Sequence, residues 1–303
     1  MTTGLAGKLT SLLASELHSW QADQPAKPAS QLTEETDMAQ RVAMVNNKGG
    51  VGKTTTTIRV AEGLAKAGHR VLVVDMDPQG NASRRLGWAY NPDAPQLTIS
   101  EAIQADAAGA VAQVIQPIGW DVDYATRIAL APARLELENR MSEAGIVGAW
   151  RRLTKALEGA DDHYAYTLID CPPSLFHLTQ LALAAADCVV IISEPEYDSV
   201  EAAVRVRDFV RARAVELANP DLALAGVIVN AKQNLASHAD QLASIRELFG
   251  DLVWDPVVPH RSLLVDADGD EIPLSEVRGE KANEVRAVYE LLAQSLVKAV
   301  PAL

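Results

Sequence analysis

A ten-residue run of the chain, Asn46 to Thr55, has the sequence N-N-K-G-G-V-G-K-T-T and is suited to binding phosphate. Its glycines allow the backbone to approach an anion closely and to turn N–H groups toward it. Lys53 can reach the β- and γ-phosphates of a nucleotide, and the Thr54 hydroxyl suits Mg²⁺. Thr55 is placed to contact the α-phosphate. The predicted nucleotide contacts of this loop are Gly49, Gly50, Val51, Gly52, Lys53, Thr54 and Thr55.

The loop departs from the usual phosphate-loop pattern G-x-x-x-x-G-K-[ST]. Asn47 occupies the position of the first glycine, and an additional lysine, Lys48, stands five residues before Lys53. A glycine-rich turn with incidental lysines is the alternative. The expected strand before the loop and the expected helix after it favour the phosphate loop, because the N-terminus of a helix adds its positive dipole end.

Acidic residues occur at or just beyond the ends of two apolar runs. Asp77 follows the run Val71–Asp75, and Asp170 ends the run Thr167–Asp170. Ligands of open α/β sheets bind at the carboxyl ends of the strands, so we expect both side chains near the phosphate loop. For Asp75 we favour a structural role. Asp170 and Asn230, which ends a later run, each have a simpler alternative as turn residues.

The elements that must position these residues alternate along the chain. Short apolar runs without period-two alternation, separated by helical stretches, predict a doubly wound, mostly parallel α/β sheet with helices on both faces. The expected strands are Val42–Asn46, Val71–Asp75, Thr167–Asp170, Val189–Ile192, Ala225–Asn230 and Val253–Val258, with a strand or two near Asp121–Ala131. The expected helices are Thr54–Ala67, Leu175–Ala186, Ser199–Leu217, Ala239–Phe249 and Lys281–Val300.

Residues 1–40 differ from the rest of the chain. Apolar side chains recur there at helical spacing, at Leu5, Leu9, Leu12, Leu13, Leu17 and Trp20. A stretch rich in Pro, Ala, Thr, Gln and acids follows, from Gln21 to Gln40. This pattern predicts a short amphipathic helix and a linker, 1–40, joined to a main domain, 41–303. We expect the helix to pack in a dimer or against a partner protein.

The composition limits the class of protein. A net charge of −13 excludes a chain that is basic throughout, although a local basic stripe could still bind nucleic acid. No apolar stretch is long enough to span a bilayer, and the N-terminus lacks the features of a signal peptide. Cys171 and Cys188 have no metal-like spacing, and small buried hydrophobic side chains are a better interpretation than an iron–sulfur site. We expect a cytoplasmic protein and no membrane partner.

Four motifs in order resemble the ParA/MinD family of deviant-Walker-A P-loop ATPases. They are K-G-G-V-G-K-T-T, V-L-V-V-D-M-D-P-Q-G-N-A-S, L-I-D-C-P-P-S and L-A-A-A-D-C-V-V-I-I-S-E-P-E. The resemblance covers nearly everything from Arg41 onward. The D-M-D-P-Q-G-N-A-S motif and the stretch Leu130–Glu138 are most similar to the ParA/Soj branch, which partitions DNA.

The resemblance implies roles for individual residues. Lys48 would reach across a homodimer interface to the partner's ATP, and Asp77 would position or activate the attacking water. Asp170 would support Mg²⁺ through water. Asn230 and Pro259 lie where the family holds adenine. The resemblance therefore implies a Mg²⁺-dependent ATPase that forms an ATP-bound sandwich dimer and is stimulated by a ParB-like centromere-binding protein.

The ParA branch also binds duplex DNA non-specifically, which implies a nucleoid-associated protein with basic side chains on one face. The candidates are Arg205, Arg207, Arg211, Lys232, Arg246 and Arg261, with Arg213, Arg278, Lys281 and Arg286 as further basic positions. Ordinary solvated helix faces are the alternative. The segment Val258–Ala267 departs from the branch pattern I-P-R-N-x-R-L-S-E-A, because only Arg261 is basic there. DNA binding at this segment would therefore depend on Arg261 and on other helices.

Two other functions compete with partition. The first is a MinD-like ATPase that positions a complex on a membrane or protein surface. The C-terminal stretch has a mixed-charge polar face, which favours packing on the core over lipid binding. The second is a nucleotide-gated scaffold with little turnover. The presence of Lys53, Asp77 and Asp170 argues against the scaffold.

Overall fold

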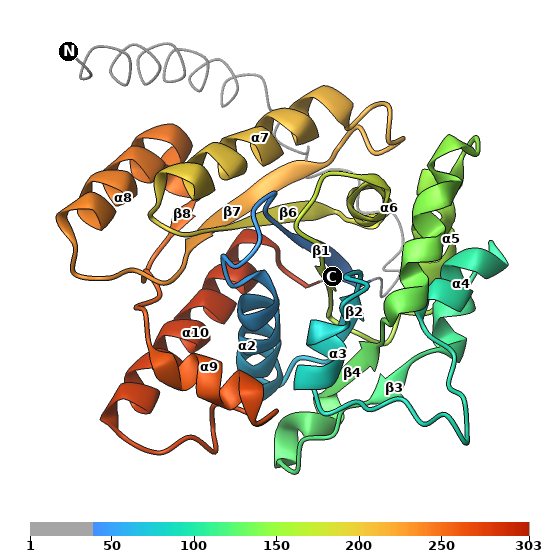
Figure 1. Ribbon diagram of the computed structural model, residues 1–303, viewed down its shortest axis with the longest axis horizontal. Coiled ribbons are helices and arrows are strands. Elements are labelled where there is room, and N and C mark those ends of the chain that lie inside the picture. Colours follow the sequence, from blue (N-terminus) through green and yellow to red (C-terminus); the bar gives the residue numbers. More distant parts are fainter. Residues whose placement is uncertain (1–38, 303) are drawn as a thin grey trace.

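The computed structural model describes residues 39–302, which form one eight-stranded sheet covered by helices on both faces (Figure 1). The strands are β1 (Gln40–Val45), β2 (Val71–Asp75), β3 (Gln116–Pro117), β4 (Ile128–Ala131), β5 (Tyr166–Asp170), β6 (Cys188–Ser193), β7 (Ala223–Val229) and β8 (Val253–Trp254). Their order is β3-β4-β2-β5-β1-β6-β7-β8, and only the β3–β4 pair is antiparallel. The predicted doubly wound, mostly parallel α/β fold is confirmed.

The helices connect these strands. They are α2 (Lys53–Lys66), α3 (Asn81–Arg85), α4 (Ile99–Ala105), α5 (Arg152–Leu157), α6 (His177–Ala185), α7 (Tyr197–Arg213), α8 (Ala236–Phe249), α9 (Ser262–Gly269) and α10 (Glu280–Ala299). The 3₁₀ segments of the described residues, η1 to η5, occupy Ala110–Gln113, Asp123–Arg127, Leu135–Gly145, Ala149–Arg151 and Gly250–Leu252. The predicted N-terminal helix and most of its linker lie outside the described residues.

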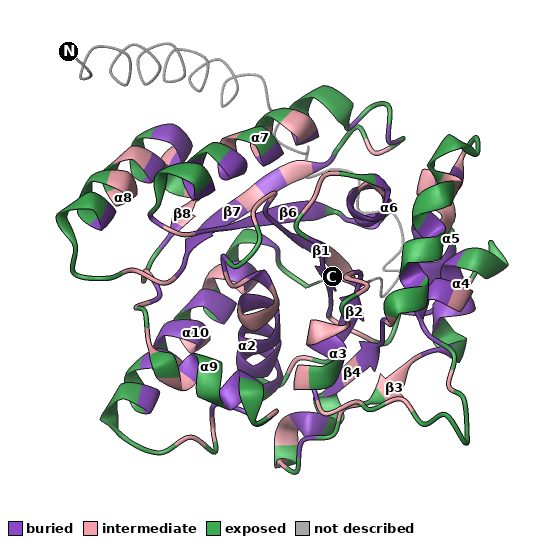
Figure 2. Cartoon of the chain, viewed as in Figure 1, coloured by how far each residue is buried: buried purple, intermediate pink, exposed green. Residues whose placement is uncertain are grey.

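Burial explains why the strands lack alternation. Every residue of β2, β5 and β6 is buried, because helices cover both faces of the sheet (Figure 2). Along β1, Val42 and Met44 pack into the cluster that includes α2, α9 and α10. Ala43 and Val45 pack into the cluster on the other face, with α4 to α8. The sheet is thus packed between two hydrophobic clusters, one on each face.

One predicted strand is shorter in the structure than expected. The run Val253–Val258 forms only the two-residue strand β8. Pro256 has no N–H to donate to a ladder, so pairing stops before it. The chain then returns to the sheet, where the Val258 N–H donates to the Val229 carbonyl at 2.9 Å and Pro259 bridges to Lys232. This return brings Pro259 beside the end of β7.

The register aligns three strands at their carboxyl ends. Asp170 pairs in register with Met44 of β1 and with Asp75 of β2. The acids at the ends of β2 and β5 therefore lie beside the strand that leads into the phosphate loop. Among residues 39–302, no helix is both long enough and apolar enough to cross a membrane.

Candidate nucleotide-binding site

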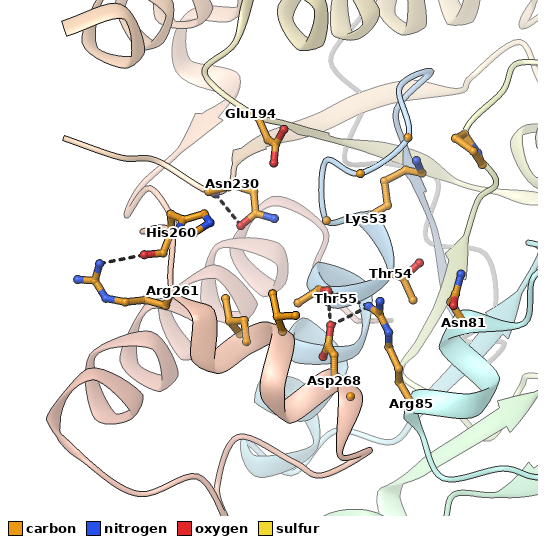
Figure 3. Close-up of a pocket in the computed structure, with 18 of the residues that line it drawn as sticks. Lys53, Thr54, Thr55, Asn81, Arg85, Glu194, Asn230, His260, Arg261 and Asp268 are labelled. Carbon is orange, nitrogen blue, oxygen red and sulfur yellow. Dashed lines mark hydrogen bonds and ion pairs between the residues drawn. The ribbon is translucent and has the colours of Figure 1, made fainter. Parts of the chain in front are cut away.

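A cavity of about 690 Å³ opens at the carboxyl ends of the central strands (Figure 3). Its walls come from the loop before α2, from the β2–α3 connection, from the segment after β7, and from α9. Of the predicted nucleotide contacts, the cavity lining includes Gly49, Gly50, Gly52, Lys53, Thr54, Thr55, Asn230 and Pro259. Segments that are far apart in the sequence thus meet at one site.

The phosphate loop needs glycine where its backbone turns. Gly50 and Gly52 have φ values of 82° and 80°, in the left-handed region that favours glycine. A Cβ atom on Gly52 would also lie 2.0 Å from the Asn230 side-chain nitrogen. That nitrogen donates to the Val51 carbonyl at 3.1 Å, and the Asn230 side-chain oxygen accepts from the Ala231 N–H at 2.8 Å. Asn230 therefore ties the loop to the end of β7.

Lys53 begins α2 and is buried in the cavity wall. Its Nζ donates to the Lys48 carbonyl at 3.0 Å, across the turn of the loop. Burial lowers the pKa of Lys53, while the nearby carboxylates of Asp170 and Asp77 oppose that shift. The ammonium is thus held inside the loop that is shaped for phosphates, with carboxylates close by.

The metal-binding candidates are in direct contact. Thr54 Oγ1 donates to Asp170 Oδ2 at 2.7 Å, and Thr57 Oγ1 donates to the other carboxylate oxygen at 3.0 Å. Burial raises the pKa of Asp170 to about 6, against the hydrogen bond from Thr54 and the charge of Lys53. Residues 39–302 contain no group of three or more His, Cys, Asp or Glu side chains that could hold a metal. A hydroxyl beside a single carboxylate fits Mg²⁺ that takes its other oxygens from phosphates and water.

Asp75 and Asp77 differ in their surroundings. Asp75 is fully buried and accepts hydrogen bonds from the Ser83 N–H and hydroxyl, both at 2.8 Å, and from the Asp77 N–H at 3.1 Å. Burial, together with the charge of Asp170, raises the pKa of Asp75 to about 7. Asp77 lines the cavity, and its carboxylate accepts the Gln79 N–H at 3.0 Å. Asp75 thus fixes the turn that presents Asp77.

Lys48 has a different environment from Lys53. Its Nζ lies 2.9 Å from Glu196 Oε2, in the segment between β6 and α7. Both side chains are partly exposed, at 27% for Lys48 and 48% for Glu196. The hydrogen bond from Lys48 lowers the pKa of Glu196. The Lys48 backbone N–H donates to the Asn46 side-chain oxygen at 2.9 Å, which fixes the base of this lysine.

Sequence reasoning missed several residues of the cavity wall. Arg85 on α3 and Asp268 on α9 face each other across Thr55, and Glu194 lies near Asn230 (Figure 3). The sequence pattern does not predict helix α9, and Arg85 lies just after the family motif that ends at Ser83. Two arginines in succession, Arg84 and Arg85, were the only signal available there.

The DNA candidates fall on two parts of the surface. Arg205, Arg207 and Arg211 lie on α7 and Arg246 lies on the neighbouring α8, whereas Lys232 and Arg261 lie near the cavity. Four of these six cations pair with acids: Arg205 with Glu201, Arg207 with Asp208, Arg246 with Asp255 and Arg261 with Glu284. Arg211 and Lys232 remain outside these ion pairs. The candidate basic face is therefore largely neutralised within this subunit.

The two cysteines are buried, as predicted. Cys171 belongs to the hydrophobic cluster on one face of the sheet and Cys188 to the cluster on the other. Burial raises the pKa of the Cys171 thiol, so this side chain is uncharged at neutral pH. Both packing environments agree with small hydrophobic side chains.

Comparisons with known proteins agree with this geometry. The family model described as "AAA domain" matches residues 39–224. The sporulation initiation inhibitor protein Soj of Bacillus subtilis is 36% identical over 240 residues, which cover 78% of this chain and 90% of Soj. The chromosome partitioning protein ParA of Caulobacter vibrioides is 36% identical over 232 residues, which cover 75% of this chain and 82% of ParA.

A solved structure supports the fold. The ATP complex of a McdA variant from Cyanothece superposes with a TM-score of 0.74 at 22% identity, covering 88% of this chain and 98% of that chain. At this identity the similarity concerns the fold alone. The loop, the acids and the cavity described above agree with the matches to Soj and to ParA. The extent of these matches identifies the chain as a member of the ParA/Soj group within the ParA/MinD family of deviant-Walker-A P-loop ATPases.

Proposed function

We propose that this protein is a partition ATPase, which binds Mg²⁺–ATP, dimerises around it, and hydrolyses it under the control of a ParB-like partner. One observation carries the proposal. Lys53, Thr54 and Asp77 line one cavity, and buried Asp170 accepts a hydrogen bond from Thr54 in its wall, while the Nζ of Lys48 pairs with Glu196. The subunit has the groups that bind phosphate and metal, and it keeps a second lysine near its surface.

The chemistry of phosphoryl transfer explains why a second subunit is needed. The reaction mainly requires positioning of the reactants and neutralisation of the charge that spreads over the phosphate oxygens. Lys53, Thr54 and Asp170 serve the ATP of their own subunit, and bound Mg²⁺ would neutralise charge on the β- and γ-phosphates. Asp77 orients the attacking water. Lys48 from the partner subunit completes the site, as an arginine finger does in other NTPases.

The surface that binds DNA is proposed to be the face of α7 and α8. Arg205, Arg207 and Arg246 there already pair with acids of the same subunit. These pairs are exposed at one partner or both, so each contributes little stability and can exchange for a phosphate contact at low cost. Two copies of the face in an ATP dimer would double the number of contacts, and affinity rises steeply with that number. DNA binding should therefore depend on ATP.

Two measurements test the proposal. Sedimentation with ATP and Mg²⁺, using Asp77→Ala to slow hydrolysis, should show a dimer that ADP does not support. Retention on random duplex DNA should require ATP and should weaken with salt. Arg211→Ala should lower the slope of log affinity against log salt by about 1 for each phosphate that Arg211 neutralises. Arg127→Ala, an exposed arginine on η2 away from α7, is the matched control.

The outcome also separates this proposal from the MinD-like alternative. ATP-dependent binding to anionic liposomes without DNA retention would favour positioning on a membrane. A monomer with every nucleotide would contradict the shared site itself.

A further inference from the structure

Helix α9 places a buried carboxylate in the wall of the nucleotide cavity. The side chain of Asp268 is 6% exposed. Its Oδ1 accepts a hydrogen bond from Arg59 Nη2 at 2.8 Å, and its Oδ2 accepts from Arg85 Nη1 at 2.7 Å. Thr55 Oγ1 also donates to Oδ2, at 2.5 Å. One carboxylate therefore joins α2, α3 and α9 (Figure 3).

The contact with Thr55 puts Arg85 at the phosphate end of the cavity. Arg85 Nη1 lies 2.9 Å from Thr55 Oγ1. Thr55 is the second threonine of the phosphate loop, in the first turn of α2, and is the residue expected to contact the α-phosphate. A phosphate oxygen bound by the Thr55 hydroxyl would lie next to the Arg85 guanidinium. Charge-assisted hydrogen bonds between guanidinium and phosphate are among the strongest in proteins.

The guanidinium of Arg85 has N–H donors that the contacts with Thr55 and Asp268 do not use. Nη1 makes both of its hydrogen bonds, to Thr55 and to Asp268. The Nε–H is buried and has no acceptor among residues 39–302. A buried donor without an acceptor is costly, and a guanidinium carries five N–H donors. The Nε–H itself is out of reach of a phosphate, but the side chain as a whole is 23% exposed and lines the cavity, so a phosphate can approach the exposed part of the guanidinium.

The carboxylate of Asp268 is shared by several donors. Asp268 is shared between Arg85 and Arg59, and the latter is 1% exposed and cannot reach solvent. Glu62 also pairs with Arg59, at 3.3 Å, but its oxygens accept the backbone N–H groups of Leu274 and Ser275 as well. The carboxylate of Asp268 is therefore only partly available to neutralise Arg85. Asp268 positions the guanidinium of Arg85 beside Thr55.

We propose that Arg85 is a ligand for the α-phosphate of the bound nucleotide, and that Asp268 is the residue that positions it. The inference rests on the proposed function, since it takes an adenine nucleotide as the ligand of the cavity. The α-phosphate is common to ATP and ADP, so Arg85 raises the affinity for both and does not discriminate between them. Hydrolysis and the contact of Lys48 with a partner are separate steps.

Calorimetric binding of ADP and of ATP, each with Mg²⁺, tests this assignment. Arg85→Ala should weaken both nucleotides by a similar factor, roughly tenfold to a hundredfold, as expected for hydrogen bonds to a charged group. Arg85→Lys keeps the charge but not the fork of donors, so it should fall between wild type and Arg85→Ala. Arg127→Ala removes the same charge from an exposed side chain outside the lining of the cavity, and should cost less than about threefold.

Asp268→Asn distinguishes a phosphate-binding role of Arg85 from a purely structural role. It keeps the shape of the side chain but replaces one acceptor oxygen by an NH2 group, so Arg85 is less well positioned and nucleotide affinity should fall, by less than in Arg85→Ala. If Arg85→Ala and Asp268→Asn weaken binding equally, Arg85 acts only by holding α9, and the assignment is wrong. It is also wrong if Arg85→Ala binds ADP within about threefold of wild type, the limit expected for an exposed charge.

The same experiment distinguishes this failure from a failure of the proposed function. Nucleotide binding by a wild-type chain that never forms an ATP dimer would refute the partition proposal and leave the Arg85 test intact. A wild-type chain that binds neither nucleotide would refute both. Thermal unfolding of each variant without nucleotide shows whether it is folded. If Arg85→Ala does not fold, Arg85→Lys supplies the comparison.

Discussion

The ammonium of Lys48 lies 2.9 Å from the carboxylate of Glu196 in the same subunit. The expected role of Lys48 is in the site of a partner subunit, so this ion pair must exchange for a phosphate contact when the dimer forms. The pair is partly exposed, and such pairs contribute less than about 1 kcal/mol. Glu196 can therefore hold the lysine ready without preventing its release.

Glu196→Gln should strengthen ATP-dependent dimerisation, because it removes the competing charge. The dimer exchanges one such pair in each subunit, so two pairs of this strength predict a dimer dissociation constant lowered by up to about thirtyfold. Sedimentation velocity at several protein concentrations with ATP measures it. Glu201→Gln, which removes an equally exposed acid from the Arg205 pair, is the matched control. Weaker dimerisation of Glu196→Gln would show that Glu196 instead orients Lys48 toward the partner.

Gly52→Ala should cost more stability and more nucleotide affinity than Gly50→Ala. Both glycines have φ near 80°, so an added Cβ strains the backbone by about 1–2 kcal/mol at either position. At Gly50 the Cβ meets nothing within 4 Å, whereas at Gly52 it meets the Asn230 amide at 2.0 Å. Urea unfolding should show the larger loss for Gly52→Ala. Equal losses would mean that Asn230 moves aside freely.

The parts of the site that could be predicted share one property, a local pattern. The glycines of the phosphate loop and the acids at the ends of β2 and β5 are each determined by a strand and the few residues after it. The parallel register then brings Asp75 and Asp170 together. An element order that alternates strand and helix was enough to infer both covered faces of the sheet.

The remainder depends on contacts between distant segments. Asp268 meets Thr55 across 213 residues, and Arg85 meets Asp268 across 183 residues. Neither pairing leaves a periodic signal in the sequence. The arginines of α7 and α8 were identified because basic residues gather in these segments, but their acidic partners include Asp255, which follows β8. Counting the basic residues along the sequence therefore overestimated the positive charge of this face, because acids from the same subunit pair with most of them.

Protonation of His177 should contribute a loss of stability in mild acid. It is the first residue of α6 and is buried. Burial lowers its pKa below the usual 6.5, a shift that the charge of Glu143 opposes and the charge of Arg152 reinforces. At His177 the unfolded chain therefore takes up a proton before the folded one as pH falls through 6.5, and this contribution lowers the free energy of unfolding. The raised pKa values of buried Asp75 and Asp170 contribute in the opposite direction, because there the folded chain takes up the proton first.

Urea unfolding between pH 7.5 and pH 5.5 measures this dependence, in buffers chosen on either side of the usual histidine pKa of about 6.5. The slope of stability against pH should be smaller in His177→Gln than in wild type. His163→Gln, at an exposed histidine, should keep the wild-type slope. An unchanged slope in His177→Gln would show that other groups cause the acid sensitivity.

Asp77→Ala should bind ATP and dimerise but hydrolyse slowly. Asp77 lines the cavity on a turn that Asp75 fixes, so removing its carboxylate leaves the phosphate loop and the Thr54–Asp170 contact in place. Loss of a group that orients or deprotonates water costs roughly 100-fold or more in turnover. Asp75→Asn, in contrast, should lower stability, because one amide oxygen cannot accept three hydrogen bonds. Phosphate release together with sedimentation distinguishes them, and rapid turnover by Asp77→Ala would assign the water to another residue.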